Sequence, residues 1–195
     1  MENVLAWIVT VLIIVAGLWL FRQSKTGRRM PAALRRGQPL PDFQAADEKG
    51  QPVESRSLLG APAVILFVRG NWCPFCTAQV ADLTSHYKEI VDLGSRLIFV
   101  TPKPLETTRR VAEFYEVEFD FWLDEELKIT KQLDLLHHDG VPGDYHVEYG
   151  SETVWPAALV VDAEGMIRFS EVSKTVADRP DSKKLLTELR RFVRS

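Results

Sequence analysis

Cys73 and Cys76 are the only cysteines in the 195 residues, and they close the stretch FVRGNWCPFC, which begins at Phe67. Two thiols separated by two residues can pass between a dithiol and a disulfide, because the second sulfur reaches the first. In such a pair, the thiolate of one cysteine attacks and the other cysteine resolves the mixed disulfide. The spacing therefore indicates redox chemistry at sulfur.

The elements around the pair decide which sulfur attacks. Residues 63–68 (AVILFV) are apolar throughout and predict a buried strand, and apolar residues recur at three and four positions from Val80 to Val91, which predicts a helix ending at Gly94. A strand that leads directly into this helix places Cys73 at the helix N-terminus and Cys76 one turn later. Pro74 suits the first turn. Unpaired amides and the helix dipole stabilise a thiolate there, so we expect Cys73 to be the nucleophile and Cys76 the resolving thiol.

Other uses of the two cysteines stay open at this point. A zinc site needs four ligands, and the missing two would come from histidines that fit no zinc-finger spacing: His86, His137, His138 and His146. A purely structural disulfide would close a loop too short to remove much chain entropy. Two inert core cysteines are the third alternative. We expect no metal and no organic cofactor.

The remaining pattern predicts one α/β domain over residues 39–195. Its short apolar runs, separated by helical patterns, indicate a central sheet with parallel crossovers, flanked by helices. The further predicted strands are Arg96–Val100, Ala157–Val161 and Met166–Ser170, the last two joined by a turn at Asp162–Gly165, and the further predicted helices are Thr107–Tyr115, Glu125–Leu133 and Asp181–Val193.

The N-terminal stretch Val4–Phe21 holds eighteen residues and no charge. As a helix it spans about 27 Å, close to the ~30 Å hydrocarbon core of a bilayer. We therefore predict a transmembrane anchor over residues 1–21 and a basic linker over residues 22–38. A cleaved signal peptide is the alternative, but the N-terminus lacks the basic region that such a signal needs.

The flanking charges predict the orientation of the anchor. Six cations follow the apolar stretch and none precedes it: Arg22, Lys25, Arg28, Arg29, Arg35 and Arg36. By the positive-inside rule, a single-pass protein of a bacterial-type inner membrane would then have its domain in the cytoplasm, with the periplasm as the alternative. The net charge of -3 gives no general affinity for polyanions, so we expect no nucleic acid partner.

Several segments resemble the thioredoxin-like superfamily, and specifically redoxins of the alkyl hydroperoxide reductase and thiol-specific antioxidant (AhpC/TSA) family. The stretch RGNWCPFC after an apolar strand resembles the active site of that family. The opening Gly37–Phe43 resembles its G-x-x-x-P-D-F start, Gly50–Leu59 its hairpin and short helix, and Trp155–Asp162 its late strand that begins with proline.

The resemblance implies a thioredoxin-like fold and assigns roles to particular residues. Cys73 is implied as the nucleophile and Cys76 as the resolving thiol. Pro156 is implied as a cis-proline beside them, with a trans proline at the start of an edge strand as the alternative. Trp72 is implied as a shield over the disulfide.

The sequence also departs from the peroxidase pattern of the family. A peroxiredoxin has Thr or Ser three residues before its peroxidatic cysteine, and a distant Arg helps to bind the peroxide oxygens; here Gly70 stands at that position. No Arg occurs from Asp144 to Glu164, and Arg69 is the cation near the loop that could substitute.

These observations predict a membrane-anchored thiol–disulfide oxidoreductase that exchanges the Cys73–Cys76 dithiol with a protein substrate and draws electrons from an unidentified donor. A peroxiredoxin-like thiol peroxidase on the same fold is the first alternative, and a non-catalytic membrane-tethered binding module is the second. The polar segment from His137 to Gly150 precedes Pro156, and loops near active sites often select the partner.

Overall fold

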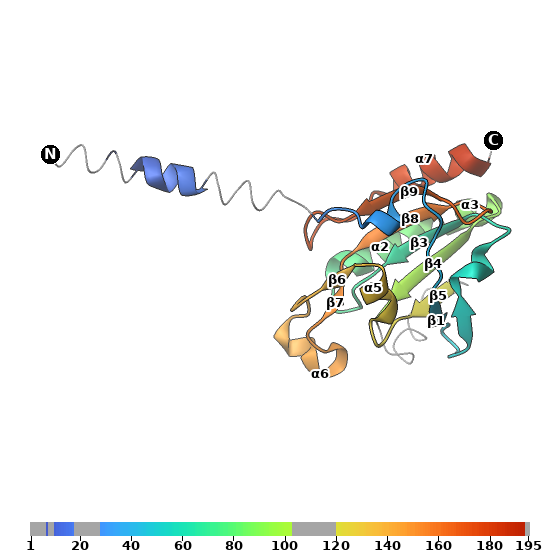
Figure 1. Cartoon of the computed structure of the whole chain (residues 1–195), viewed down its shortest axis with the longest axis horizontal. Helices are drawn as coiled ribbons and strands as arrows, with labels where there is room; N and C mark the ends of the chain where they lie inside the picture. Colours follow the sequence, from blue (N-terminus) through green and yellow to red (C-terminus); the bar gives the residue numbers. More distant parts are fainter. Residues whose placement is uncertain (1–6, 8–9, 18–27, 103–119, 194–195) are drawn as a thin grey trace.

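The computed structural model describes residue 7 and residues 10–17, 28–102 and 120–193, so the predicted helix Thr107–Tyr115 lies outside the described residues. Within these ranges a seven-stranded mixed sheet runs in the order β2-β1-β5-β4-β3-β8-β9 (Figure 1). Its strands are β1 (Gln44–Ala46), β2 (Pro52–Glu54), β3 (Ala63–Phe67), β4 (Arg96–Thr101), β5 (Asp120–Leu123), β8 (Ala157–Val161) and β9 (Ile167–Val172). The expected α/β architecture, a mixed sheet flanked by helices, is confirmed.

The central strand β3 is buried on both sides. It pairs in parallel with β4 and antiparallel with β8, and β4 pairs in parallel with β5. Successive side chains of a strand point to opposite faces. Ile65 and Phe67 therefore enter one hydrophobic core and Val64 and Leu66 the other, which explains why the sequence run is apolar throughout.

Helices cover both faces of the sheet. The core that contains Val64 also takes residues from α2 (Pro74–Ser85), α3 (Tyr87–Asp92) and α7 (Ser182–Val193), whereas α5 (Lys128–Gln132) contributes to the opposite core. The helix predicted to reach Gly94 is broken at His86, where the backbone leaves helical geometry at φ -103° and ψ 2°. Leu83 of α2 and Ile90 of α3 reach the same core from the two sides of this break.

A small second sheet lies at one end of the main sheet, at the lower left of Figure 1. It consists of β6 (Leu136–His137) paired antiparallel with β7 (Thr153–Val154). Between these strands the chain forms a 3₁₀ turn η3 (Gly143–Tyr145) and the short helix α6 (His146–Tyr149). We call residues 138–152 the insertion.

The predicted linker is described from residue 28 onward, and this part packs on the domain. Leu34 lies in the 3₁₀ turn η1 (Ala32–Leu34) and is fully buried in the core shared with β3. The Gly37 amide donates to the Ile167 carbonyl, and the Arg28 guanidinium donates to the carbonyl and carboxylate of Asp134. Residues 28–38 therefore belong to the fold rather than to a free linker.

The predicted membrane span falls largely outside the described residues. Residues 10–17 are helical and exposed, and among the described residues no helix is both long and apolar enough to cross a bilayer. The anchor at Val4–Phe21 therefore stays a prediction.

Pro156 does not form the cis peptide bond that the family resemblance implied, because every peptide bond in the described ranges is trans. The chain runs extended from β7 into β8 at this point. The Trp155 amide donates to the Leu135 carbonyl and the Ser173 amide to the Pro156 carbonyl, so the segment is held by backbone hydrogen bonds on both sides of the ring.

Candidate functional site

The two cysteines lie where β3 leaves the sheet and α2 begins. Cys73 is the N-cap residue of α2, Pro74 occupies the first turn, and Cys76 lies one turn along. The Cys73 carbonyl accepts the amide of Cys76, and the Cys73 amide donates to the Gly70 carbonyl at 3.2 Å. Both cysteines are free thiols, and Cys73 is 1% exposed and Cys76 2% exposed. Both residues are therefore buried.

The two sulfurs differ strongly in acidity. The pKa of Cys73 is lowered from 9.0 to about 5, chiefly because the Cys76 thiol donates a hydrogen bond to it, and the charges of Arg179 and Arg69 add to the effect. The pKa of Cys76 is raised, because its proton is held in that hydrogen bond and because its sulfur is buried. Near neutral pH the pair therefore consists of a Cys73 thiolate and a Cys76 thiol, and the more acidic sulfur is the one at the helix N-terminus.

Arg179 holds both sulfurs, although no pattern in the sequence indicates it. Its Nη2 donates to the Sγ of Cys73 at 3.0 Å and to the Sγ of Cys76 at 3.1 Å. Its Nη1 donates to the carbonyls of Val176 and Asp178, which fix the guanidinium in place. The residue lies between β9 and α7, more than 100 positions from the cysteines, so no local spacing links them.

Arg69, the cation that the sequence analysis singled out, also lies at the site but does not stand alone there. It is 5% exposed, its guanidinium donates to the Gly140 carbonyl, and its Cζ lies 4.6 Å from the centroid of the Trp72 ring. Its charge lowers the pKa of Cys73 less than that of Arg179 does. Arg69 thereby ties the cysteine loop to the insertion.

Trp72 packs under two aromatic rings of the insertion. Tyr145 stacks on it with ring centroids 6.1 Å apart, and Tyr149 meets it edge to face at 6.4 Å. Gly70 adopts a φ of +131°, and a Cβ atom there would lie 2.9 Å from Cε1 of Tyr149 and 3.0 Å from Nε1 of Trp72. The Trp72–Tyr149 contact therefore occupies the space in which a side chain of residue 70 would begin.

The adjacent histidines His137 and His138 lie in different surroundings. His138 is exposed and lies 2.8 Å from Glu152, but the ring of His137 packs on Trp155 with centroids 4.2 Å apart. Burial and the nearby Arg69 lower the pKa of His137 to about 4, so this histidine is neutral at physiological pH. Among the described residues, no three His, Cys, Asp or Glu side chains form a cluster that could hold a metal ion.

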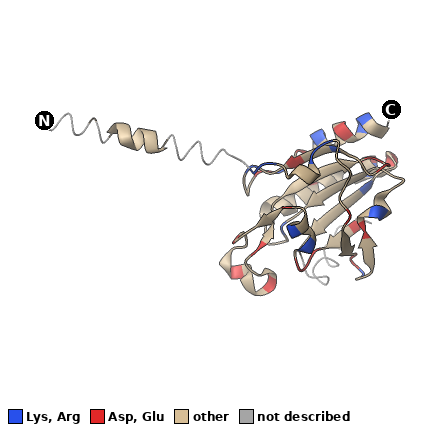
Figure 2. Cartoon of the chain, in the orientation of Figure 1, with Lys and Arg blue, Asp and Glu red and all other residues tan. Residues whose placement is uncertain are grey.

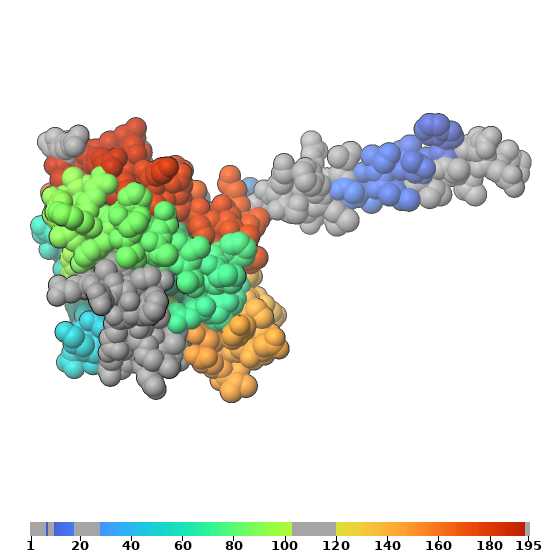
Figure 3. Space-filling view, turned by 180° about the vertical axis from the view of Figure 1, so that it is seen from behind, coloured from blue at the N-terminus to red at the C-terminus, as the bar shows by residue number. Residues whose placement is uncertain are grey.

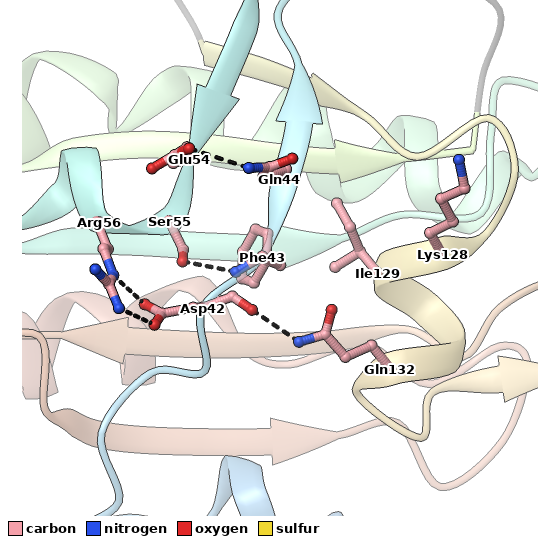
Figure 4. A pocket seen from close by; sticks show the side chains of 9 residues that line it. All are labelled: Asp42, Phe43, Gln44, Glu54, Ser55, Arg56, Lys128, Ile129 and Gln132. Carbon is pink, nitrogen blue, oxygen red and sulfur yellow. Dashed lines mark hydrogen bonds and ion pairs between the residues drawn. The ribbon is translucent and has the colours of Figure 1, made fainter.

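A surface pocket between the β1–β2 hairpin and α5 does not include the cysteines (Figure 4). Its polar groups pair with one another. Arg56 forms an ion pair with Asp42, and Gln132 donates to the Asp42 carbonyl at 2.7 Å. The Phe43 amide donates to the Ser55 hydroxyl. These groups hold the hairpin in place, and neither cysteine lines this pocket.

The sequence profile that describes the AhpC/TSA family matches residues 36–170. The chain belongs to the AhpC/TSA family. Among relatives in this family, the chloroplastic peroxiredoxin Q of Sedum lineare is 26% identical over 138 residues, which cover 70% of this chain and 68% of that protein. The peroxiredoxin Bcp of Bacillus subtilis is 24% identical over 99 residues, which cover 51% of this chain and 63% of that protein.

Solved structures of AhpC/TSA-type proteins share the fold. The peroxidoxin BcpB of Mycobacterium tuberculosis superposes with a TM-score of 0.67 at 19% identity, covering 81% of this chain and 97% of that one. A structure of Xanthomonas campestris peroxiredoxin Q gives a TM-score of 0.64 at 17% identity, covering 85% and 96%. The thioredoxin-like fold and the family inferred from the cysteine motif are thereby confirmed.

The structure groups the predicted site residues as follows. Trp72, Cys73, Pro74 and Cys76 lie together at the start of α2. Pro156 lies at the same end of the sheet, because the next residue, Ala157, pairs with Phe67, the last residue of β3.

Proposed function

We propose that the protein is a dithiol peroxidase that reduces hydroperoxides at Cys73 and resolves the product with Cys76. The observation that carries this proposal is the Arg179 guanidinium, which donates to both sulfurs at 3.0 and 3.1 Å. It stabilises the attacking thiolate, and a guanidinium held beside the nucleophile can also donate to the leaving oxygen, on which negative charge develops when the O–O bond breaks. Kinship with peroxiredoxins in the AhpC/TSA family supports the same reaction.

The steps of this reaction balance without a cofactor. The Cys73 thiolate attacks one oxygen of the hydroperoxide, the O–O bond breaks, and the leaving alkoxide takes a proton to become an alcohol. Cys73 is then a sulfenic acid. The Cys76 thiol attacks it, a disulfide forms, and the hydroxyl leaves as water with the Cys76 proton. An external dithiol reduces the disulfide and restores the starting state.

Because Cys73 is 1% exposed, its sulfur has to be uncovered before the peroxide oxygen can reach it. Phe75 is exposed at the first turn of α2, and its ring centroid lies 5.8 Å from Cζ of Arg179. We propose that the exposed Phe75 side chain moves aside to admit the peroxide, while the Arg179 guanidinium keeps its hydrogen bonds.

Thiol–disulfide exchange with a protein substrate is the second candidate function. Gly70 favours it, because the site lacks the hydroxyl that peroxiredoxins place there and the Trp72–Tyr149 contact fills the space. In this reaction the Cys73 thiolate attacks a substrate disulfide, and Cys76 then releases the reduced substrate by forming the Cys73–Cys76 disulfide. The same thiolate and thiol serve both reactions.

Stopped-flow tryptophan fluorescence of the reduced full chain separates the two functions, because Trp72 is the residue before the nucleophile. Oxidation by hydrogen peroxide and by an alkyl hydroperoxide is compared with oxidation by a protein disulfide, in wild type and in Cys76→Ser. Fast peroxide oxidation with a sulfenic acid trapped in Cys76→Ser is the expected result. Slow peroxide oxidation with a trapped mixed disulfide would instead establish exchange, and a Cys73 that reacts with neither would favour the binding module.

We also propose that Val4–Phe21 anchors the protein in a membrane with its domain in the cytoplasm, on the basis of the uncharged stretch and the cations that follow it. A membrane-impermeant thiol label tests this in intact cells. The variant combines Cys73→Ser, Cys76→Ser and Glu164→Cys, since Glu164 is exposed. Labelling only after the cells are opened is expected, and labelling of intact cells would place the domain outside.

A further inference from the structure

Exposed apolar side chains gather around the cysteines. Outside the N-terminal helix, the exposed large apolar residues of the described chain are Leu59, Phe75, Val91, Tyr145, Val147 and Val176. Three of these are linked to the site by contacts, and the fourth, Val147, lies near one of them, Tyr145, in the chain. The Phe75 ring lies 5.8 Å from Cζ of Arg179, and the Val176 carbonyl accepts a hydrogen bond from Arg179. Tyr145 stacks on Trp72, and Val147 follows it in the insertion.

These four residues come from three separate segments that meet around the sulfurs. Figure 3 shows the orange insertion and the orange-red segment before α7 on either side of the green start of α2. We call Phe75, Tyr145, Val147 and Val176 the apolar collar. Val147 lies in α6 and is 103% exposed, so its side chain is fully accessible to a partner. Exposed apolar residues that cluster in this way mark interaction surfaces.

The insertion makes this surface negatively charged. No lysine or arginine occurs from residue 132 to residue 167, whereas the insertion carries Asp139, Asp144, Glu148 and Glu152. Figure 2 shows red without blue along the helical turns of the insertion. Glu152 pairs with His138 and lies 3.8 Å from Lys131. The two arginines of the site are buried or half-buried, whereas Asp139, Asp144 and Glu148 are exposed, so these three carboxylates make the rim of the insertion acidic.

We propose that the apolar collar and the acidic insertion form the docking surface for a protein dithiol whose reactive cysteine is surrounded by apolar and basic residues. Apolar contact at the centre with complementary charge at the rim is the usual anatomy of such an interface. This proposal depends on the proposed function in one respect: the Cys73–Cys76 disulfide has to form during the catalytic cycle.

The reaction at this surface is a two-electron reduction. One thiolate of the partner attacks one sulfur of the disulfide and displaces the other as a thiolate. The second thiol of the partner then attacks the mixed disulfide, so the partner leaves oxidised and both cysteines of this chain are reduced. Arg179 stabilises the displaced thiolate, as it does in the reduced protein.

The test uses two synthetic Cys-Gly-Pro-Cys dithiol peptides with the same apolar flanks, one bearing lysines and the other glutamates. The rate at which each peptide reduces the oxidised full chain is measured at low and high salt. The lysine peptide is expected to react roughly tenfold faster at low salt, and salt is expected to remove this advantage, because the steering of rim charges is screened.

Matched variants localise the effect. Asp144→Lys is expected to lower the rate at which the lysine peptide reduces the disulfide roughly two- to fivefold. Glu164→Lys lies at the opposite end of the sheet and is expected to leave this rate unchanged. Val147→Ser is expected to lower the reduction rate with both peptides. Val91→Ser, at an exposed valine outside the apolar collar, is expected to lower it with neither peptide. Equal rates for the two peptides, or equal losses in a variant and its control, would overturn the proposal. Peroxide turnover driven by dithiothreitol tests the proposed function separately, because this small reductant needs no docking surface.

Discussion

Replacing Arg179 with methionine removes the guanidinium that contacts both sulfurs and keeps an apolar chain of similar length. Two separate effects are expected: the pKa of Cys73 rises, and the transition state of peroxide reduction loses a hydrogen-bond donor. The structure allows the sizes of the two effects to be compared, because Arg179 donates to each sulfur through a single nitrogen.

The effect on the thiolate is the smaller of the two. A hydrogen bond to a charged group contributes about 1.5–3 kcal/mol, and one pKa unit corresponds to about 1.4 kcal/mol. Starting from about 5, the pKa of Cys73 would rise to roughly 6–7. The sign follows from the thiolate being the reactive form, so the rate falls as pH drops through the pKa. At pH 8 more than about 90% of Cys73 would still be ionised in the variant.

The loss of transition-state stabilisation is larger. Removing one preorganised donor to a developing oxyanion costs about 10²–10³ in rate. The assay is the second-order rate of peroxide oxidation by stopped flow between pH 4.5 and 8.5, together with the ultraviolet absorbance of the thiolate. We expect Arg179→Met to move the midpoint of the pH–rate profile to higher pH and to lower the plateau rate at pH 8 by about 100-fold. Arg191→Met, at an exposed ion pair with Glu188, is the matched control. An unchanged plateau would refute the catalytic role, and an unchanged midpoint would refute the contact with the thiolate.

Three further predictions test other parts of the site and fold. Cys76→Ala removes the thiol that donates to the nucleophilic thiolate, so it should raise the pKa of that thiolate more than Cys76→Ser does, since a hydroxyl still donates; ultraviolet titration of the two variants measures the difference. Gly70→Thr should not accelerate peroxide reduction, because a side chain there meets Tyr149 at 2.9 Å with φ at +131°, and chemical denaturation should show a loss of about 1–3 kcal/mol. Leu34→Ala should lower the free energy of unfolding by about 2–5 kcal/mol, with Leu59→Ala, at an exposed site, changing it little; equal effects would mean that the segment before residue 39 is not part of the core.

The centre of the fold was predictable because its strands are buried on both faces. The runs at Ala63–Val68, Arg96–Val100 and Ala157–Val161 are apolar at every or nearly every position, and they became β3, β4 and β8. The strand β5 was not predicted, because its four residues carry too short a pattern. The packing of residues 28–38, the described part of the predicted linker, on the domain was not predicted, because a few apolar residues among arginines do not reveal that Leu34 reaches the core.

The chemistry of the site was predictable only as far as it is local. A proline-containing motif at the end of a strand predicts a cysteine at a helix N-terminus, and Cys73 lies there. The helix dipole was the expected cause of its acidity, whereas the largest cause is the hydrogen bond from Cys76. Arg179 gave no signal, because only the packing of α7 against the sheet beside α2 brings its loop to the sulfurs.

Gly70 and Arg179 together explain how the site can differ from other members of the family and still hold a thiolate. A hydroxyl at residue 70 and the edge of the Tyr149 ring cannot occupy the same space, so the insertion and that hydroxyl are alternatives. The insertion supplies the aromatic cover of Trp72 and an acidic rim, while Arg179 supplies the donors to both sulfurs. Arg179 and Arg69 both lower the pKa of Cys73, and both are buried or half-buried, so the exposed residues around them are free to form the surface that we propose selects a partner.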